Sequence, residues 1–231
     1  MIPSADIIIG HHADDDEHRT AARIWVTRWY AARGYRVVTG TATGVDWCKA
    51  DAYNPAVAAS TADVVVLADA DSFPDADALA EAVDMADRLG WAAPFDQVRR
   101  LSYDATMMLL DCDPATTDVP PDRRVEADVH DVLPGGGIVV MRRELALACG
   151  PYDRRFVGWG GEDFALGNTA RTLTGNYAGT VGGPLWHLWH PRHAAVMSHD
   201  TRVLINAYRR AKFQPDAIRS LIDEGSRHGT G

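Results

Sequence analysis

An apolar run from Val64 to Leu67 ends on two carboxylates, Asp69 and Asp71, which are two residues apart. Consecutive branched apolar residues are typical of a strand that is buried on both faces, and such strands belong to parallel sheets covered by helices. In open α/β sheets, ligands bind beyond the carboxyl ends of the strands. The run therefore predicts a buried strand that carries an acidic pair to a ligand-binding edge.

The acidic pair has two interpretations. Carboxylate oxygens hold hard divalent cations, and such a cation can hold the phosphates of a nucleotide substrate. Aspartate is also common after strands because its side chain accepts hydrogen bonds from nearby backbone amides, and Pro74 ends the run. The stretch by itself is compatible with a metal site and with an ordinary turn.

The first half of the chain alternates expected strands with expected helices. The strands are expected at residues 6–10, 35–39 and 63–68, and the helices at 21–33, 45–60 with an interruption near Pro55, and 77–89. This alternation predicts an α/β fold with a doubly wound, mostly parallel sheet and helices on both faces. A candidate strand at 91–95 and a mostly helical segment at 97–110 complete this half. The acidic run at 14–17 suits a solvated first helical turn better than a metal site.

The second half begins with a long loop at 111–134, rich in Pro, Asp and Thr, of the kind that forms lids or binding segments. Three glycines at 135–137 precede an apolar strand at 138–141; they form either a flexible turn or a close approach of a ligand to the backbone. Two helices are expected at 201–212 and 215–224. The length favours one compact domain over residues 1–231, with appended C-terminal helices from about residue 199.

Two adjacent carboxylates, Glu162 and Asp163, follow a tryptophan, Trp159, that glycines flank. Such a tryptophan can offer a flat apolar face to a sugar ring while neighbouring carboxylates hold the sugar's polar groups. Either carboxylate can take a proton from a hydroxyl nucleophile. The same pair is also a favourable acidic start for a helix.

Three histidines, His187, His190 and His193, lie within seven residues. The first two are three residues apart, and on a helical turn or a similarly curled loop that spacing directs two imidazoles at one ion. A lone histidine is usually structural or exposed. Three beside flanking tryptophans, in a chain with nine histidines, favour a ligand role for at least one of them.

The charge and the cysteines restrict the partners and the compartment. A formal net charge of −9 argues against a surface that neutralises many phosphates, so nucleic acid is an unlikely partner. Cys48, Cys112 and Cys149 are widely spaced and form no CxxC pair, as expected of free thiols in a reducing compartment. There is no basic, then apolar leader and no apolar run of about 18 residues. We therefore expect a soluble, cytoplasmic protein without a membrane span.

These motifs, in this order and at these separations, resemble those of nucleotide-sugar glycosyltransferases of the GT-A fold, close to family 2 and to the C-terminal half of β-1,4-galactosyltransferases. The resemblance covers about residues 5–195, and the ordered set is more specific than any one motif. It implies a Rossmann-like domain with a nucleotide-binding half at about 1–110 and an acceptor and metal half at about 111–198. The motifs are Ala68-Asp69-Ala70-Asp71, Gly135-Gly136-Gly137, Gly158-Trp159-Gly160-Gly161-Glu162-Asp163 and His187-x-x-His190.

The resemblance implies roles for individual residues. Asp69-Ala70-Asp71 resembles the DxD motif, in which the last aspartate binds a divalent metal, Mn²⁺ or Mg²⁺, and the first lies nearer the nucleotide ribose. Asp163 is similar to the catalytic base of inverting members. His190 is similar in placement to the metal-binding histidine, and His187 lies where some relatives have a second metal ligand.

The donor and acceptor contacts are implied in the same way. Gly136 and Gly137 resemble the lining of the donor-sugar pocket, and Lys49 lies on a segment similar to the helix that these enzymes place before the acidic pair. Trp159 and Glu162 resemble acceptor-binding positions.

Two places that help to hold the nucleotide base depart from the family pattern. Relatives usually have Pro followed by Arg or Asn after the first strand, where this chain has Gly10-His11-His12. They commonly end the second strand with Asp, where this chain has Thr39-Gly40-Thr41. Gly10 and His11 are therefore candidate donor-binding residues, and a UDP-sugar is the default donor.

The implied activity is metal-dependent, inverting transfer of a sugar from a nucleotide diphosphate sugar to a hydroxyl of a glycan, protein or small-molecule acceptor. The cation would neutralise charge on the departing diphosphate while a base deprotonates the acceptor, which attacks the anomeric carbon from the opposite face. A metal-dependent nucleotide-sugar hydrolase would use water as the acceptor. A non-catalytic sugar-binding module would need no base.

Overall fold

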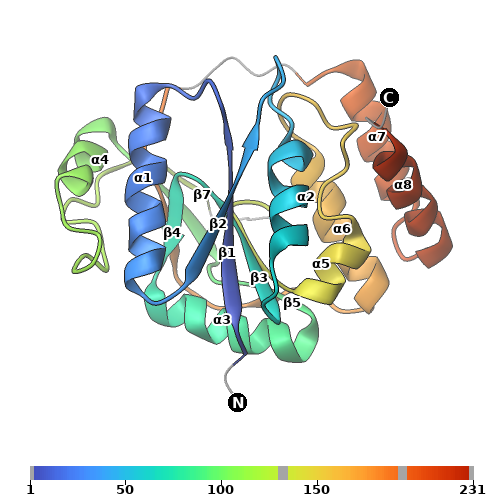
Figure 1. The fold of residues 1–231 in the computed structure, drawn as a ribbon, viewed down its shortest axis with the longest axis horizontal. Coiled ribbons are helices and arrows are strands. Elements are labelled where there is room, and N and C mark those ends of the chain that lie inside the picture. Colours follow the sequence, from blue (N-terminus) through green and yellow to red (C-terminus); the bar gives the residue numbers. More distant parts are fainter. Residues whose placement is uncertain (1–2, 130–134, 192–196, 229–231) are drawn as a thin grey trace.

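The structure is a computed structural model that describes residues 3–129, 135–191 and 197–228 (Figure 1). Its helices are α1 (Glu17–Ala32), α2 (Lys49–Ala59), α3 (Ala76–Leu89), α4 (Tyr103–Leu110), α5 (Arg143–Cys149), α6 (Glu162–Thr174), α7 (His199–Arg210) and α8 (Pro215–Arg227). Its strands are β1 (Ala5–His12), β2 (Arg36–Ala42), β3 (Val64–Asp69), β4 (Ser72–Pro74), β5 (Trp91–Ala93), β6 (Gln97–Leu101), β7 (Val125–Val129), β8 (Ile138–Arg142), β9 (Gly179–Thr180) and β10 (Pro184–His187).

The larger sheet has six strands in the order β2-β1-β3-β8-β5-β9. Strand β1 is parallel to both β2 and β3, whereas β8 is antiparallel to β3 and β5, so the sheet is more mixed than predicted. Because β1 lies between β2 and β3, the chain crosses over in opposite directions from β1. The carboxyl ends of β1 and β3 are thus the switch point at which α/β sheets bind ligands.

Both faces of this sheet are buried. Ile7 and Ile9 of β1 pack into the cluster that contains α1 and α3, whereas Ile8 packs into the cluster that contains α2, α5 and α6. Figure 1 shows α1 on one side of the central strands and α2, α5 and α6 on the other. Each fully buried side chain of this size contributes roughly 1.5–3 kcal/mol, which explains why these strands have continuous apolar sequences. The predicted α/β architecture with covered faces is confirmed.

A second sheet, which the sequence did not predict, has the order β4-β10-β6-β7. Strand β10 is antiparallel to β4 and parallel to β6. The prediction of a mostly helical segment at 97–110 was wrong for its first part, since Gln97–Leu101 forms β6 and the helix begins at Tyr103. Pairing with β10 and β7 supplies hydrogen bonds that the local sequence does not indicate.

Three other element predictions need correction. Helix α1 begins at Glu17 rather than at residue 21, because the Asp16 side chain caps it by accepting from the Arg19 amide at 2.9 Å. The acidic run thus lies at a helix start, as expected. Helix α2 continues through Pro55 instead of being interrupted there. The expected loop at 111–134 contains β7, and its last five residues lie outside the described ranges.

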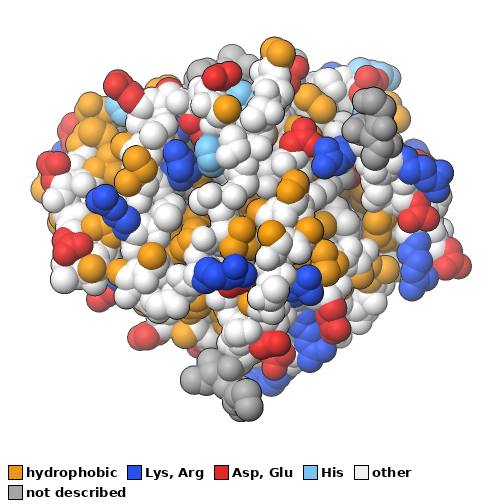
Figure 2. Space-filling view, viewed as in Figure 1, with side chains coloured by type: hydrophobic (Ala, Val, Ile, Leu, Met, Phe, Trp, Pro, Cys, Tyr) orange, Lys and Arg blue, Asp and Glu red, His pale blue; other side chains and the backbone are white. Residues whose placement is uncertain are grey.

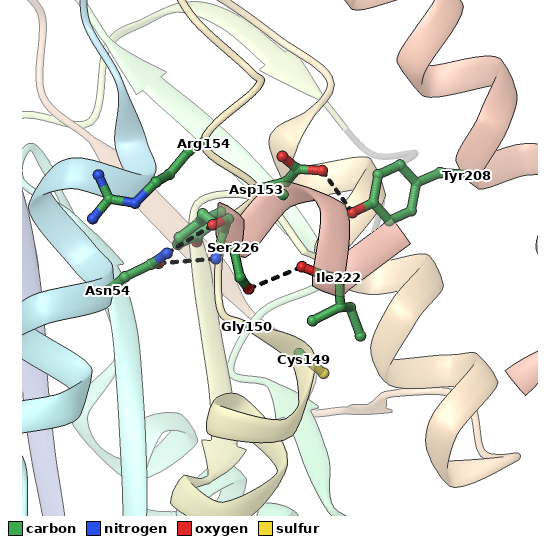
Figure 3. A pocket seen from close by; sticks show the side chains of 10 residues that line it. Asn54, Cys149, Gly150, Asp153, Arg154, Tyr208, Ile222 and Ser226 are labelled. Carbon is green, nitrogen blue, oxygen red and sulfur yellow. Dashed lines mark hydrogen bonds between the residues drawn. The ribbon is translucent and has the colours of Figure 1, made fainter. Parts of the chain in front are cut away.

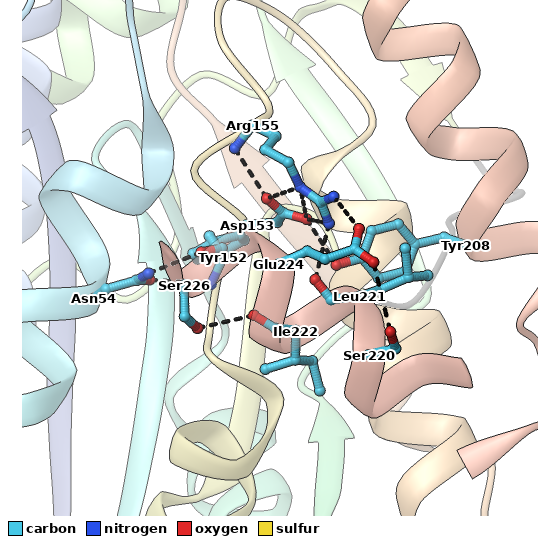
Figure 4. Close-up of polar contacts among 10 residues, drawn as sticks. All are labelled: Asn54, Tyr152, Asp153, Arg155, Tyr208, Ser220, Leu221, Ile222, Glu224 and Ser226. Atoms are coloured by element: carbon cyan, nitrogen blue, oxygen red, sulfur yellow. Dashed lines mark hydrogen bonds and ion pairs between the residues drawn. The ribbon is translucent and has the colours of Figure 1, made fainter. Parts of the chain in front are cut away.

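The expected C-terminal helices, α7 and α8, pack on α6 around a buried aspartate. Asp153 accepts a hydrogen bond from the Tyr208 hydroxyl at 2.9 Å and forms an ion pair with Arg155, which also bonds Glu224 of α8 at 2.8 Å (Figure 4). A Cβ at Gly225 would lie 2.6 Å from the Asp153 carboxylate, so only glycine permits this approach. Charge-assisted bonds of this kind anchor α7 and α8 to the domain.

Beside this anchor is a small cavity of about 40 Å³, lined by residues that include Asn54, Tyr208 and Ser226 (Figure 3). That volume holds about one or two water molecules and no nucleotide. A ligand site for a larger substrate must therefore lie elsewhere.

The face in Figure 2 carries Lys and Arg side chains interspersed with Asp and Glu, and histidines are visible toward its upper edge. Among the described residues, no helix combines the length and the apolar character that crossing a bilayer requires.

Candidate active site

Asp71, His187 and His190 form a cluster with the composition of a metal site. Each offers one ligand atom, and these atoms lie within 4.8 Å of one another. His187 Nε2 lies 3.7 Å from Asp71 Oδ1, and His190 Nε2 lies 3.4 Å from Asp71 Oδ2. The structure thus brings together the three residues that the sequence nominated as metal ligands. His193, the third histidine of the motif, lies outside the described residues.

Backbone pairing sets the position of these ligands. His187 ends β10 and lies opposite Ser72 of β4, next to Asp71. The Leu188 amide donates to the Asp71 carbonyl at 2.8 Å, and the Trp189 amide donates to Thr106 Oγ1 at 2.8 Å. The two imidazoles therefore approach one point from a strand end and the loop after it, not from a helical turn.

The hydrogen bonds of the imidazoles identify their tautomers. His187 Nδ1 lies 2.8 Å from the Leu188 carbonyl oxygen, and His190 Nδ1 lies 3.0 Å from that of Pro191. Because a carbonyl oxygen only accepts, each Nδ1 carries a proton, and Nε2 is the nitrogen that faces Asp71 and could coordinate a cation. Metal-binding histidines are oriented in the same way.

The charges of the cluster suit a cation. Burial tends to raise the pKa of Asp71, but His187, His190 and Arg19 outweigh it and hold that pKa below its usual value. Burial lowers the pKa of His187, against the effect of Asp71, so this imidazole is neutral at neutral pH. One carboxylate and two imidazoles suit a transition-metal ion such as Mn²⁺ better than Mg²⁺, which prefers oxygen ligands.

A second group of charges lies at the end of the same strand. Lys49, the first residue of α2, is 7% exposed, and its Nζ lies 2.9 Å from Oδ1 of Asp69 and 2.9 Å from Oδ1 of Asp163. Burial opposes the lysine charge, but the two carboxylates outweigh it and hold the pKa of Lys49 well above its usual value. One ammonium thus joins the first aspartate of the acidic pair to the start of α6.

Asp163 has the protonation behaviour of a base that works near neutral pH. Burial raises the pKa of Asp163 to about 7, and Lys49 opposes this rise. The negative charges of Glu162 and Asp69 add to it. About one third of the Asp163 side chain stays accessible, so it can reach an exchangeable proton.

The glycine run packs directly on this group. A Cβ at Gly135 would lie 2.2 Å from the Asp163 carbonyl oxygen, and one at Gly136 would lie 3.1 Å from Asp163 Oδ2. The Asp69 amide donates to the Gly137 carbonyl at 2.9 Å. The glycines thus permit close approach of the start of α6, and close approach of a ligand to them stays a prediction.

Gly10 and His11 lie at the carboxyl end of β1. A Cβ at Gly10 would lie 2.1 Å from the ring of Tyr53, whose hydroxyl donates to the Ala68 carbonyl at 2.7 Å. His11 Nδ1 donates to the His12 carbonyl at 3.0 Å, and its Nε2 shares a hydrogen bond with Thr41 Oγ1 at 3.0 Å. The two departures from the family pattern therefore contact each other across β1 and β2.

Trp159 and Glu162 lie on the segment that leads into α6. The Trp159 side chain is 66% exposed, and Gly158, Gly160 and Gly161 have φ values of 83°, 91° and 97°, which side chains rarely adopt. Glu162 opens α6 directly before Asp163. Glu162 and Asp163 therefore begin a helix, and Asp163 also belongs to the Lys49 group.

This chain is similar to known proteins in structure and not in sequence. No protein-family model matches the sequence, and no curated protein matches it. The catalytic domain of Drosophila β1,4-galactosyltransferase 7, solved in complex with xylobiose, superposes with a TM-score of 0.50 and 14% identity over 87% of this chain and 80% of that chain. GalNAc-T7, solved with UDP, GalNAc and Mn²⁺, superposes with a TM-score of 0.52 and 11% identity over 97% of this chain and 55% of that chain.

The chain has a GT-A fold. The fold predicted from the ordered motifs is therefore confirmed. Within this GT-A fold, strand β3 places Asp69 in the Lys49 group and the turn after it places Asp71 in the metal cluster.

The GT-A fold also places two arginines that the sequence analysis missed. Arg100 Nη1 of β6 lies 3.2 Å from His187 Nε2, and the charge of Arg19 in α1 acts on Asp71. Arg100 lay in a segment predicted to be mostly helical, and only the pairing of β6 with β10 brings it to the site. No local pattern around either arginine indicates this position.

Proposed function

We propose that this protein is a metal-dependent glycosyltransferase that moves a sugar from a nucleotide diphosphate sugar to an acceptor hydroxyl. One observation carries the proposal. The end of β3 connects two groups: Asp71 with the imidazoles of His187 and His190, and Asp69 with Asp163 through Lys49. The proposed cation ligands and the proposed base thus both contact the end of β3 and the turn after it, at the edge where α/β sheets bind ligands.

The proposed metal ligands are Asp71, His187 and His190, and Mn²⁺ is the proposed ion. The mixed donor set supports this choice, and the Nδ1 hydrogen bonds leave Nε2 of each imidazole as the nitrogen for coordination. A divalent cation, when bound, neutralises negative charge on the departing diphosphate. The GalNAc-T7 structure with UDP and Mn²⁺ supports the same pairing of metal and nucleotide.

Asp163 is the proposed catalytic base. Its pKa of about 7 lets it accept the acceptor's hydroxyl proton at an Oδ atom near neutral pH. Lys49 holds the carboxylate in place and favours its ionised form. A single displacement on the face opposite the leaving group would invert the anomeric centre, and proton NMR of the first product would reveal its configuration.

The proposed donor contacts are Gly10, His11, Lys49, Asp69, Gly136 and Gly137, with a UDP-sugar as the default donor. The hydrogen bond between His11 and Thr41 supports a polar environment for the nucleotide base at the end of β1. The proposed acceptor contacts are Trp159, which exposes an apolar ring face, and Glu162. We propose a nucleotide-binding half at about residues 1–110 and an acceptor and metal half at about 111–198. Asp71 of the first half would complete the metal site, and Gly136 and Gly137 of the second half would reach the donor sugar.

The test is a panel of UDP-sugars with Mn²⁺, measured with and without sugar acceptors. Binding of a donor should raise the unfolding temperature only when Mn²⁺ is present, because a ligand of the folded state stabilises it by mass action. UDP release should then increase when the correct acceptor is added. Release that never depends on an acceptor would identify a hydrolase, and binding without release would identify a sugar-binding module.

A further inference from the structure

Arg100 is a half-buried cation next to the candidate metal ligands. The parallel register of β6 and β10 places it opposite His187, whose other strand neighbour is Ser72 of β4. The guanidinium Nη1 lies 3.2 Å from His187 Nε2. The pairing of β6 with β10 therefore fixes the position of Arg100 next to His187.

The contact occupies the lone pair that a metal would need. His187 Nδ1 carries the proton that it donates to the Leu188 carbonyl, so Nε2 accepts the hydrogen bond from Arg100. A neutral imidazole has one such lone pair, in the plane of its ring. His187 can therefore accept from Arg100 or coordinate a cation, but it cannot do both.

Arg100 also lacks an anionic partner within the parts of the chain that the structure describes. Its neighbour Arg99 pairs with Asp128 at 3.2 Å and lies over the Trp186 ring, with its guanidinium carbon 5.3 Å from the ring centroid. Arg100 instead places a permanent positive charge against a neutral ring. A cation that is partly removed from water without a counter-charge is costly, which favours an anionic ligand at this point.

We propose that Arg100 binds the diphosphate of the donor and covers His187 until a metal ion is bound. With a cation on His187 Nε2, the guanidinium of Arg100 would no longer donate to that nitrogen and would pair with phosphate oxygens instead. The planar guanidinium suits this ligand because it donates two parallel hydrogen bonds to a phosphate. The inference rests on the proposed function, which supplies the diphosphate.

Two opposite effects follow from this arrangement. Without nucleotide, Arg100 competes with the metal for His187 and repels it, so removal of the guanidinium should strengthen metal binding. With Mn²⁺ and nucleotide present, removal of the guanidinium should weaken nucleotide binding, since charge-assisted hydrogen bonds to the phosphates would be lost. A merely structural arginine would not produce opposite changes in the two affinities.

The experiment measures binding rather than activity. Free Mn²⁺ is followed by electron paramagnetic resonance without nucleotide, and UDP binding is followed by calorimetry at saturating Mn²⁺. For Arg100→Gln we expect a Kd for Mn²⁺ that is lower than in the wild type and a Kd for UDP that is higher by roughly 10-fold or more. Arg99→Gln is the matched control on the same strand, and both of its Kd values should stay within about 2-fold of the wild type.

Each other outcome overturns a stated part of the inference. If the wild type binds UDP and Arg100→Gln binds it equally well, Arg100 does not hold the diphosphate. If Arg100→Gln binds Mn²⁺ more weakly, Arg100 supports His187 rather than covering it. If the wild type binds no nucleoside diphosphate among UDP, GDP, ADP and CDP, the proposed function itself is wrong. If Arg100→Gln does not fold, Arg100→Lys is the second variant. It keeps the positive charge but cannot form the bidentate hydrogen bonds, and it should still weaken UDP binding.

Discussion

Lys49 Nζ lies 2.9 Å from Oδ1 of Asp163, although the two residues are 114 positions apart in the chain. The same nitrogen contacts Asp69 at the end of β3. This buried ammonium links the candidate donor side to the candidate base. The pKa of Asp163 depends on burial and on the charges of Lys49, Glu162 and Asp69.

Replacing Asp163 with Asn should abolish most transfer while metal and donor binding survive. A positioned general base contributes roughly 100- to 10,000-fold to the rate, so kcat should fall by about that factor. Acceptor-dependent UDP release measures kcat, and calorimetry with UDP and Mn²⁺ measures binding. The exposed Asp216, changed to Asn, is the control. Loss of UDP binding in Asp163→Asn would reassign the residue to the donor site.

The rate of transfer should depend on pH through Asp163. Its pKa is raised to about 7, and only the ionised carboxylate accepts a proton. We therefore expect kcat/KM to fall as the pH is lowered through about 7, with Mn²⁺ kept saturating at every pH. A profile that is flat between pH 6 and 8 would show that another group is the base.

The free energy of unfolding should depend on the protonation of Asp163 in the opposite direction to the rate, decreasing as the pH rises. Because the pKa of Asp163 is higher in the folded state than its usual value of 3.8, its contribution to stability is greatest below pH 3.8 and is lost as the pH rises toward 7. Relative to the wild type, Asp163→Asn should gain stability between pH 4 and 7, and the difference should be constant above that range. Urea unfolding of the metal-free proteins measures it, and a difference that shrinks with pH would contradict the raised pKa.

Replacing Lys49 with Met leaves two carboxylates near each other without their shared cation. We expect the free energy of unfolding to fall by about 2 kcal/mol at pH 8, within the range for leaving a buried polar group unpaired. The acid limb of kcat/KM should move to higher pH, because Lys49 now lowers the pKa of Asp163. Lys212→Met, on the exposed surface, should change stability by less than about 0.5 kcal/mol. An unmoved acid limb would mean that Lys49 does not act on the base.

Replacing His190 with Ala removes one proposed metal ligand. The Mn²⁺ concentration needed for UDP binding should rise by at least about 10-fold, because even the loss of a residue that only hydrogen-bonds to a metal ligand lowers metal affinity by about that factor. His199→Ala, at the exposed start of α7, is the control. If the Mn²⁺ requirement is unchanged, the coordinating histidine is His187 or lies outside this motif.

The local sequence predicted those elements whose burial leaves a pattern within the segment itself. The run from Val64 to Leu67 is apolar because β3 is covered on both faces, and the alternation of strands and helices in the first half follows from the same burial. The second sheet was not predictable, because β6 depends on partners at 125–129 and 184–187. Strand pairing between distant segments leaves no periodic signal in a stretch of five residues.

The sequence by itself determined the types and order of the chemical groups: the acidic pair, the glycine run, Glu162-Asp163 and the two histidines. Only the tertiary structure decided that Asp71 faces His187 and His190 while Asp69 shares Lys49 with Asp163, and that Arg100 lies on His187. The physical reason is distance. Electrostatic coupling acts over a few ångströms in space, and the strand order and register, not the chain positions, bring these charges that close.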